Sequence, residues 1–228
     1  ILWSVGVTAL VPMVAQAAVT CPTLEAGDLF KVPGNTAVYL LNANMQRMYF
    51  PSGEVYKTWY KDFSGVVEIP NTCVDAYQAS SVAPYGVNYR PGSRLVKVEI
   101  SPSVYVVEPN NKISKIGSEE VARALYGAAW ASLVRDIPDV YWPNYVGRGA
   151  EVTEAIPHNG QLVRVEGSED IYVVKDGKTH KVEASQAASV AAVTLGGVAK
   201  SDVRVISQAV FNRVAAGTGT VTEGTLYA

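Results

Sequence analysis

Few residues of this chain have the types and spacing that catalysis requires. The two histidines are His158, in the segment PHNG, and His180, on an apolar run, and neither has a histidine partner at metal-ligand spacing. The sequence contains no G-x-S-x-G motif, phosphate-binding loop or G-x-G-x-x-G segment. The acidic loops YKDFSG and RDIPDV lack the regular spacing of a calcium loop. We therefore expect no catalytic residue, no cofactor and no metal site, and predict that the protein is not an enzyme.

Two cysteines, Cys21 and Cys73, are the other candidates for chemistry. Two thiols are too few for a zinc or iron–sulfur site. Outside the cell, the simplest arrangement is a disulfide between them. Closing a loop across their separation of 52 residues would stabilise the fold by roughly 4 kcal/mol. Two unpaired thiols are the alternative.

Aromatic residues are candidates for contact with a glycan or a protein partner. The segment VYWPNY supplies Tyr141, Trp142 and Tyr145, and Pro143 keeps it out of regular structure. We predict that these three aromatic residues form an exposed contact site. Stacking on sugar rings is the alternative for the other aromatic residues, Tyr39, Tyr105, Tyr172, Trp59 and Trp130. The three tyrosines lie on apolar runs and are expected to pack in the core instead.

The first 18 residues, ILWSVGVTALVPMVAQAA, form an apolar segment without charge. The small residues Ala15, Ala17 and Ala18 favour a secretory signal peptide that is cleaved near this point. A retained apolar assembly segment, either a helix or a strand donated to a neighbouring molecule, is the alternative. The alternating positions of a donated strand would be Trp3, Val5, Val7, Ala9 and Val11. Both interpretations place the rest of the chain outside the cytoplasm.

Composition limits the classes of partner. The chain has 228 residues, of which 48% are hydrophobic and 18% charged, enough to bury a substantial core. Its formal net charge of −2 argues against nucleic acid as a partner, because phosphate binding requires a basic face. Lysine and arginine are scattered and form no polybasic membrane patch.

A segment of about 66 residues recurs three times along the chain. Its opening leucines are Leu29, Leu95 and Leu162, which are separated by 66 and 67 residues. The same two spacings separate the tyrosines of the next apolar run and the serines that follow it, namely Tyr39, Tyr105, Tyr172, Ser52, Ser118 and Ser185. Fixed-period self-similarity of this kind predicts tandem units that pack on one another.

Each copy predicts the same elements. Two apolar runs rich in β-branched and aromatic residues meet at turns such as Asp176-Gly177, and a third short strand completes a hairpin. The recurring serine is placed to cap a helix, most clearly in SEEVARALYG. The elements VVEIP, VRDIP and VRVIS then lead into an irregular arm. We predict an α+β fold of small β-hairpin-plus-helix repeats after the apolar N-terminal segment.

These residues carry a resemblance to a known family. The stretches GDLFKV, AVYLL and RMYFPSGEVYKTWYKDFSGV, with YRPGSRLVKV and VYVVEP, resemble a repeat of bacterial secreted and cell-surface proteins. That repeat runs G-x-L-[IV]-[KR], V-Y-x-[IV], a turn with G-K-[KR], and then F-P or I-P/S before a helix. The resemblance covers about residues 27–228 and implies a structural or adhesive protein of the bacterial surface or wall. Asn110-Asn111 departs from the family's turn glycine, and the third copy lacks the Trp-Tyr pair.

The predicted function follows from these observations. We expect a non-catalytic extracellular protein on the surface of a bacterium, which associates with itself as a subunit of a surface layer, a pilus-like filament or an adhesive fibre. The alternative is a peptidoglycan- or polysaccharide-binding module of a longer secreted protein. The expected boundaries are 1–18 for the apolar segment, 19–91, 92–158 and 159–222 for the three copies, and 223–228 for a further copy or a closing strand.

Overall fold

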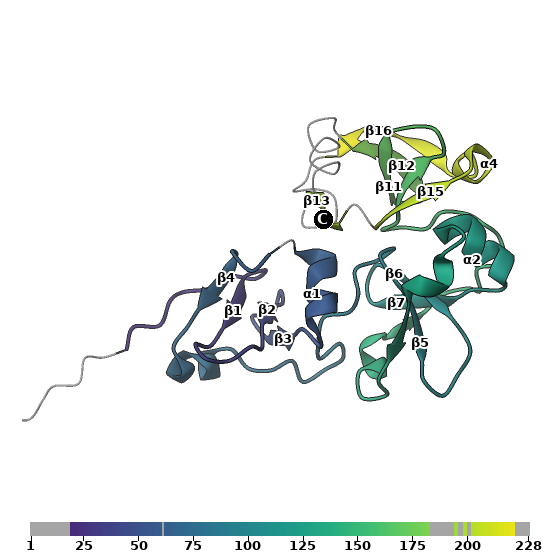
Figure 1. Cartoon of the computed structure of the whole chain (residues 1–228). Coiled ribbons are helices and arrows are strands. Elements are labelled where there is room, and N and C mark those ends of the chain that lie inside the picture. The colour runs from purple at the N-terminus through teal and green to yellow at the C-terminus, as the bar shows by residue number, and fades with distance from the viewer. Residues whose placement is uncertain (1–18, 61, 183–193, 196–197, 200–201, 222–228) are drawn as a thin grey trace, which may run out of the picture.

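The computed structural model describes residues 19–60, 62–182, 194–195, 198–199 and 202–221 (Figure 1). The expected signal segment at 1–18 lies outside the described residues. So do the donor-strand positions Trp3, Val5, Val7, Ala9 and Val11, the cap residue Ser185 and the range 223–228. None of the described helices combines the length and the apolar character that crossing a membrane requires.

The first sheet is built from a three-stranded meander and one parallel strand. Its order is β3-β2-β1-β4, and β4 pairs with β1 in parallel. A helix connects β3 to β4, and a short 3₁₀ helix, η1, follows β4. The elements are β1 (Leu29–Lys31), β2 (Tyr39–Leu41), β3 (Arg47–Tyr49), α1 (Gly53–Trp59), β4 (Val66–Glu68) and η1 (Asn71–Ala76).

The second sheet follows the same path and gains a fifth strand. Its order is β8-β5-β6-β7-β9, with both outer strands parallel to their neighbours. The elements are β5 (Leu95–Val98), β6 (Tyr105–Glu108), β7 (Lys112–Lys115), α2 (Glu119–Tyr126), η2 (Trp130–Leu133), β8 (Val134–Ile137), η3 (Trp142–Asn144) and β9 (Gly147–Arg148).

The third sheet has the order β15-β10-β11-β12-β16, again with parallel outer strands. A separate two-stranded ribbon, β13 (Thr194–Leu195) with β14 (Val198–Ala199), lies in the connection to β15. The remaining elements are β10 (Leu162–Val165), β11 (Ile171–Lys175), β12 (Lys178–Val182), β15 (Val203–Ile206), α4 (Gln208–Phe211) and β16 (Ala215–Val221).

The three evenly spaced leucines occupy equivalent points in the three sheets. Each leucine pairs with an antiparallel strand on one side and with a parallel strand on the other. The partners of Leu29 are Leu40 and Val66, those of Leu95 are Val106 and Val134, and those of Leu162 are Val173 and Val203.

The prediction of an α+β fold of hairpin-plus-helix repeats is wrong, because the chain is β-rich and its helices are short. Helices α1 and α2 have seven and eight residues. The elements VVEIP, VRDIP and VRVIS, expected only as apolar runs that lead into an irregular arm, supply the parallel strands β4, β8 and β15. A parallel partner joins segments far apart in the chain, so a short apolar run does not reveal it locally.

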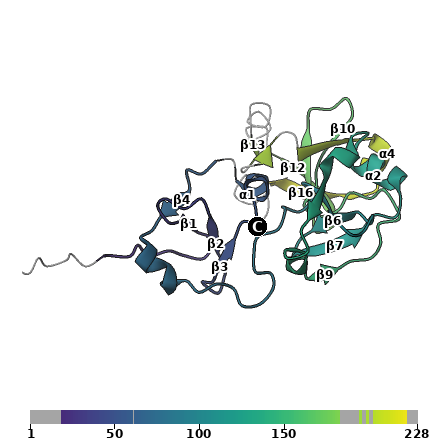
Figure 2. The same ribbon diagram turned by 60° about the horizontal axis from the view of Figure 1, so that its bottom comes forward.

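Helices α1 and α2 lie between successive sheets (Figure 2). We call the face that carries Leu29, Leu95 or Leu162 the helix face, because the first two sheets pack it against their own helix. We call the opposite face, which carries Phe30, Val96 or Val163, the acceptor face. Alternation along each strand separates the two sets.

Helix α1 shows how one short helix serves two sheets. Tyr56 packs with Leu29 of the first sheet, whereas Val55 packs with Val96 of the second sheet. Helix α2 does the same between the second and third sheets, where Leu125 lies in one cluster with Leu95 and Val163. All of these residues are at most 5% exposed. Full burial of each such apolar side chain stabilises the fold by roughly 2 kcal/mol.

Two predictions from the sequence, the serine helix caps and the disulfide, are confirmed by the structure. Ser52 and Ser118 accept hydrogen bonds from the backbone N–H groups of Val55 and Val121, at 3.2 and 3.3 Å, so the caps predicted at these serines are confirmed. The predicted disulfide between Cys21 and Cys73 is confirmed as well.

Candidate functional site

A largely buried ion cluster lies where the sheets meet. Asp202, immediately before β15, is 1% exposed and lies 3.2 Å from Nη2 of Arg90 and 2.5 Å from Nη1 of Arg94. Arg204 of β15 approaches the same carboxylate at 3.7 Å. Arg90 and Arg94 flank the turn before β5, so this one acidic side chain links the second sheet to the third.

Glu54 extends the cluster to the first sheet. It lies on α1 and accepts hydrogen bonds from Nε of Arg135, at 2.7 Å, and from Nε of Arg94, at 3.3 Å. Tyr89 donates its hydroxyl to the other carboxylate oxygen at 3.2 Å. Burial alone would raise the pKa of Glu54, but the bonds and charges of Arg135 and Arg94 outweigh burial and lower it. Arg94, just before the second sheet, therefore contacts Glu54 on the helix of the first sheet and Asp202 beside the third sheet.

The two segments that connect the sheets cross beside this cluster. A Cβ atom on Gly92 would lie 2.4 Å from Cα of Gln161, and one on Gly160 would lie 2.3 Å from Cβ of Pro91. Arg90 donates from Nη1 to the backbone carbonyl of Gly160 at 3.2 Å. Both glycines have positive φ, which other residues rarely adopt. Glycine is thus required twice at the point where the three sheets converge.

His158 lies on the second of these connecting segments. Its Nε2 is 2.5 Å from the hydroxyl of Tyr126, the last residue of α2. Burial lowers the pKa of His158 to about 4, against a smaller opposing effect of Glu108. The ring is therefore neutral at pH 7, and its contact holds α2 to the connecting segment. His180 pairs with Val173 inside the third sheet.

The aromatic residues predicted to form an exposed contact site lie largely against the second sheet. Tyr145 is 3% exposed, and Tyr141 and Trp142 are half-buried in the same cluster as Val96. The ring centroids of Trp142 and Tyr105 are 5.5 Å apart. Tyr141 and Tyr145 line a cleft of about 180 Å³ beside α1, below the usual volume of a small-molecule site. Their contact with a glycan or partner stays a prediction.

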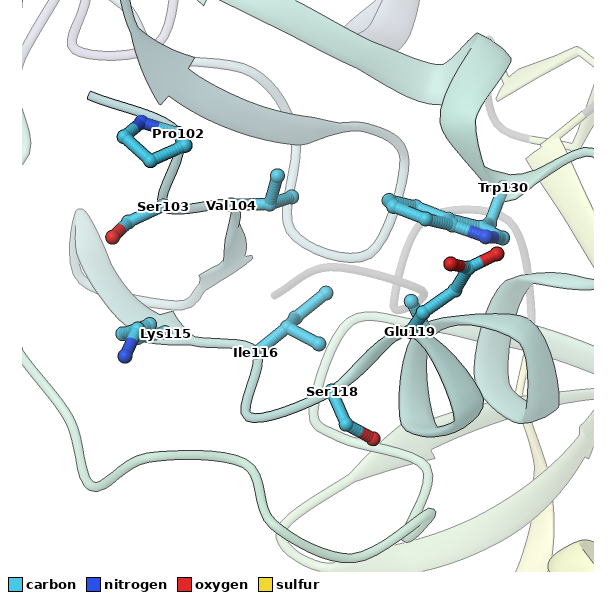
Figure 3. Close-up of a pocket in the computed structure, with 9 residues that line it drawn as sticks. Pro102, Ser103, Val104, Lys115, Ile116, Ser118, Glu119 and Trp130 are labelled. Atoms are coloured by element: carbon cyan, nitrogen blue, oxygen red, sulfur yellow. The ribbon is translucent and has the colours of Figure 1, made fainter. Parts of the chain in front are cut away.

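A different aromatic residue borders a larger cleft. Figure 3 shows Trp130 of η2 beside the carboxylate of Glu119, with Ile116 and Val104 opposite them. The cleft measures about 290 Å³ and is completed by Pro102, Ser103, Lys115, Ser118 and Ala122. It combines an apolar base, an indole ring and a polar rim. Such a surface can hold the flat apolar face of a ligand ring, while the ligand's hydroxyl groups form hydrogen bonds with the polar rim.

Sequence reasoning missed both the ion cluster and the cleft. The charged residues of the cluster are spread from Glu54 to Arg204 along the chain, so no local pattern brings them together. Trp130 was one of several aromatic residues considered for sugar stacking, but nothing in the local sequence indicates the cleft that it borders. The one signal that could have been used is the pair Arg90 and Arg94 on either side of a Pro-Gly turn that precedes an apolar strand.

Comparison with known proteins does not assign this chain to a family. No protein-family model matches this chain, and no curated protein matches it. The resemblance to the bacterial surface repeat therefore stays a prediction.

Proposed function

We propose that the chain is a non-catalytic structural and interaction protein of the bacterial cell surface, a subunit of a surface layer, filament or adhesive fibre. The observation that carries this proposal is the pairing of two acidic side chains, the buried Asp202 and the partly exposed Glu54. Asp202 and Glu54 are both paired with arginines that come from other layers. These residues join sheets to one another, which is the role expected in a rigid scaffold.

The disulfide supports the extracellular part of the proposal. Cys73 is 1% exposed, and its bridge to Cys21 fastens residues ahead of the first sheet to η1. Structural disulfides of this kind form and persist in oxidising compartments. The apolar segment at 1–18 is consistent with export.

Surface labelling of intact source cells tests this proposal. A membrane-impermeant amine reagent should label the chain before lysis, and thiol titration of the recovered chain should find its cysteines oxidised. Electron microscopy of the same surface fraction should show ordered arrays or fibres that contain the chain. Recovery of the chain only from the unlabelled cytosolic fraction, with both thiols reduced, would contradict the proposal.

The cleft beside Trp130 favours a second candidate function, binding of peptidoglycan or another polysaccharide. The indole could stack on a sugar ring while Glu119 and Ser103 bond to hydroxyl groups at the rim. Retention on insoluble peptidoglycan should then be saturable and should fall at least tenfold in Trp130→Ala. Trp130→Phe, which keeps an aromatic face, should retain most of the binding. Equal retention of the unchanged protein, Trp130→Ala and Trp130→Phe would exclude this cleft as the polysaccharide-binding site.

A further inference from the structure

One helix position differs between the first and second copies, and it concerns the cleft beside Trp130. Ser52 caps α1 and Ser118 caps α2, and the fourth residue after the cap is Tyr56 in α1 and Ala122 in α2. Both residues are 1% exposed. Ala122 lines the cleft, so the second copy has a methyl group where the first copy has a phenol ring.

The surroundings of these two helix positions are equivalent. Each residue packs against the first strand of its own sheet and against the residue that precedes the second strand. The neighbours are Leu29 and Val38 around Tyr56, and Leu95 and Val104 around Ala122. The cleft therefore corresponds to the space that the ring of Tyr56 fills in the first copy.

An aromatic residue borders this space in both copies. Phe63, between α1 and β4, stacks on the ring of Tyr56 with the ring centroids 4.4 Å apart and the planes at 13°. Trp130, between α2 and β8, packs against the cluster that contains Ala122 and borders the cleft (Figure 3). A cavity of about 150 Å³ already holds benzene, and this cleft measures about 290 Å³. The first copy therefore indicates the kind of ligand that fits the second, an aromatic ring stacked on Trp130.

The polar rim of the cleft suits a ring that carries a hydroxyl group. In the first copy, the hydroxyl of Tyr56 donates to the backbone carbonyl of Asp62 at 2.8 Å. The cleft offers the hydroxyl of Ser103 and the carboxylate of Glu119 at its rim. A tyrosine side chain from another molecule can therefore bury its ring and still make a hydrogen bond.

Tyr85 presents such a side chain on the surface of the same protein. It is 42% exposed, which makes it the most exposed tyrosine among the described residues. Its backbone N–H donates to Oδ1 of Asn144 at 2.8 Å, and Asn144 is 1% exposed. Tyr85 is therefore held at a fixed point of the surface, with its ring available to another molecule.

Tyr85 and Trp130 lie on opposite sides of the second sheet. Asn144, which holds Tyr85, belongs to η3, and η3 covers the acceptor face beside Val96. Trp130 packs in the cluster of Leu95, on the helix face. The sheet thus separates the tyrosine from the cleft of its own molecule. A contact between the tyrosine of one copy and the cleft of the next is head to tail, and such contacts extend into a filament unless the rotation between copies closes a ring.

We propose that the cleft beside Trp130 receives the ring of Tyr85 from a second copy of the chain, and that this contact joins the copies head to tail. One side chain buries less area than a standard interface, so the contact is weak and depends on a high local concentration of the chain. Its use in a surface layer or filament rests on the proposed function. The contact itself does not depend on that function.

Sedimentation velocity of the full-length chain, at concentrations up to about 1 mM, tests the contact. The average mass should rise above 24.4 kDa as the concentration increases. Ala122→Tyr fills the cleft as Tyr56 fills the equivalent space, and Tyr85→Ser removes the ring, so each should lower the association constant at least tenfold. An equimolar mixture of these two variants should associate again and stop at twice the mass of one chain, because each variant supplies the part that the other lacks.

Val67→Ser is the matched control, because Val67 is similarly exposed, at 39%, and lies on the first sheet. This variant should associate as the intact protein does. Circular dichroism of each variant establishes that it is folded. If Ala122→Tyr is unfolded, Trp130→Ala takes its place as the variant that damages the cleft.

Three results would overturn the contact. The first is an intact protein that stays at 24.4 kDa, and the second is association that is equal in all variants or absent from the mixture. The third is a loss of peptidoglycan retention in Ala122→Tyr with unchanged association, because the cleft would then bind polysaccharide. A cytosolic location of the chain would defeat the proposed function and leave the contact unaffected.

Discussion

Arg90 and Asp202 form an ion pair at 3.2 Å in which the two side chains are 0% and 1% exposed. Arg90 precedes the second sheet, whereas Asp202 immediately precedes β15, the parallel outer strand of the third sheet next to β10. Desolvation of such a pair offsets much of its electrostatic attraction, so its net contribution to stability is small. Its effect is geometric, because any other arrangement of the two sheets would leave these charges buried apart from one another.

Removal of the carboxylate that Arg90 and Arg94 share should therefore lower the free energy of unfolding by far more than the intact pair contributes to it. Asp202→Asn leaves Arg90 and Arg94 without this carboxylate in a buried site, and we expect a loss of about 3 kcal/mol in the free energy of unfolding. Denaturant titration measures this loss. Asp136→Asn is the control: its pair with Lys97 is 53% exposed on the acidic side, and its loss should stay below about 1 kcal/mol. Similar losses in the two variants would refute the role of the cluster.

The crossing of the connecting segments should tolerate no side chain at Gly92. Gly92→Ala places a Cβ atom 2.4 Å from Cα of Gln161 on a backbone in the left-handed region. We expect it to lower the free energy of unfolding by about 3 kcal/mol. Gly167→Ala has the same kind of backbone and no atom within 4 Å, so it should cost about 1 kcal/mol. Thermal or denaturant unfolding separates the two. Equal costs would show that the segments can move apart freely.

His158 should make the stability of the protein depend on pH. Its pKa falls from 6.5 in the unfolded chain to about 4 in the fold, so the unfolded state binds more protons between these values. The stabilisation is complete above pH 6.5 and is lost as the pH falls toward 4. Between pH 7 and pH 5 the free energy of unfolding should decrease by about 2 kcal/mol at most, since this half-buried ring is partly screened by water.

His158→Gln should flatten this pH dependence, whereas His180→Gln should keep it. Equilibrium unfolding at several pH values from 7 to 5 is the measurement. The window stays above the range in which the lowered pKa values of Glu54 and Glu108 would cause further loss. An unchanged slope in His158→Gln would show that another group controls it.

Ser118 should contribute as a helix cap. Its hydroxyl accepts from Val121 at the start of α2, the helix that lies between the second and third sheets. Ser118→Ala should cost about 1 kcal/mol, and Ser118→Asp should restore most of the loss. Thermal unfolding of the three proteins checks this order. Full stability in Ser118→Ala would mean that packing alone fixes the start of α2.

The sequence contained the local features of the fold and lacked its long-range pairing. Turn residues and serine caps act within a few residues, so Ser52, Ser118 and Asp176-Gly177 could be assigned directly. The parallel strand that pairs with Leu95 lies 39 residues away at Val134, and no short-range pattern marks that partner. This is why β4, β8 and β15 were missed and the fold was assigned to the wrong class.

The candidate sites show the same division. The disulfide between Cys21 and Cys73 could be predicted because the sequence contains only these two cysteines. The cluster around Asp202 could not be predicted, since its members are dispersed over three layers and each alone resembles a solvated surface charge. Tyr145 was expected to be exposed because of Pro143, but its ring packs against the second sheet instead.

Hydrogen exchange measured strand by strand tests most directly whether the buried charges join the three sheets into one structural unit. The amides of β2, β6 and β11 should open with the same free energy in the intact protein, and all three should shift together by about 3 kcal/mol in Asp202→Asn. Separate opening free energies for the three strands, with only β11 affected by the substitution, would contradict the account.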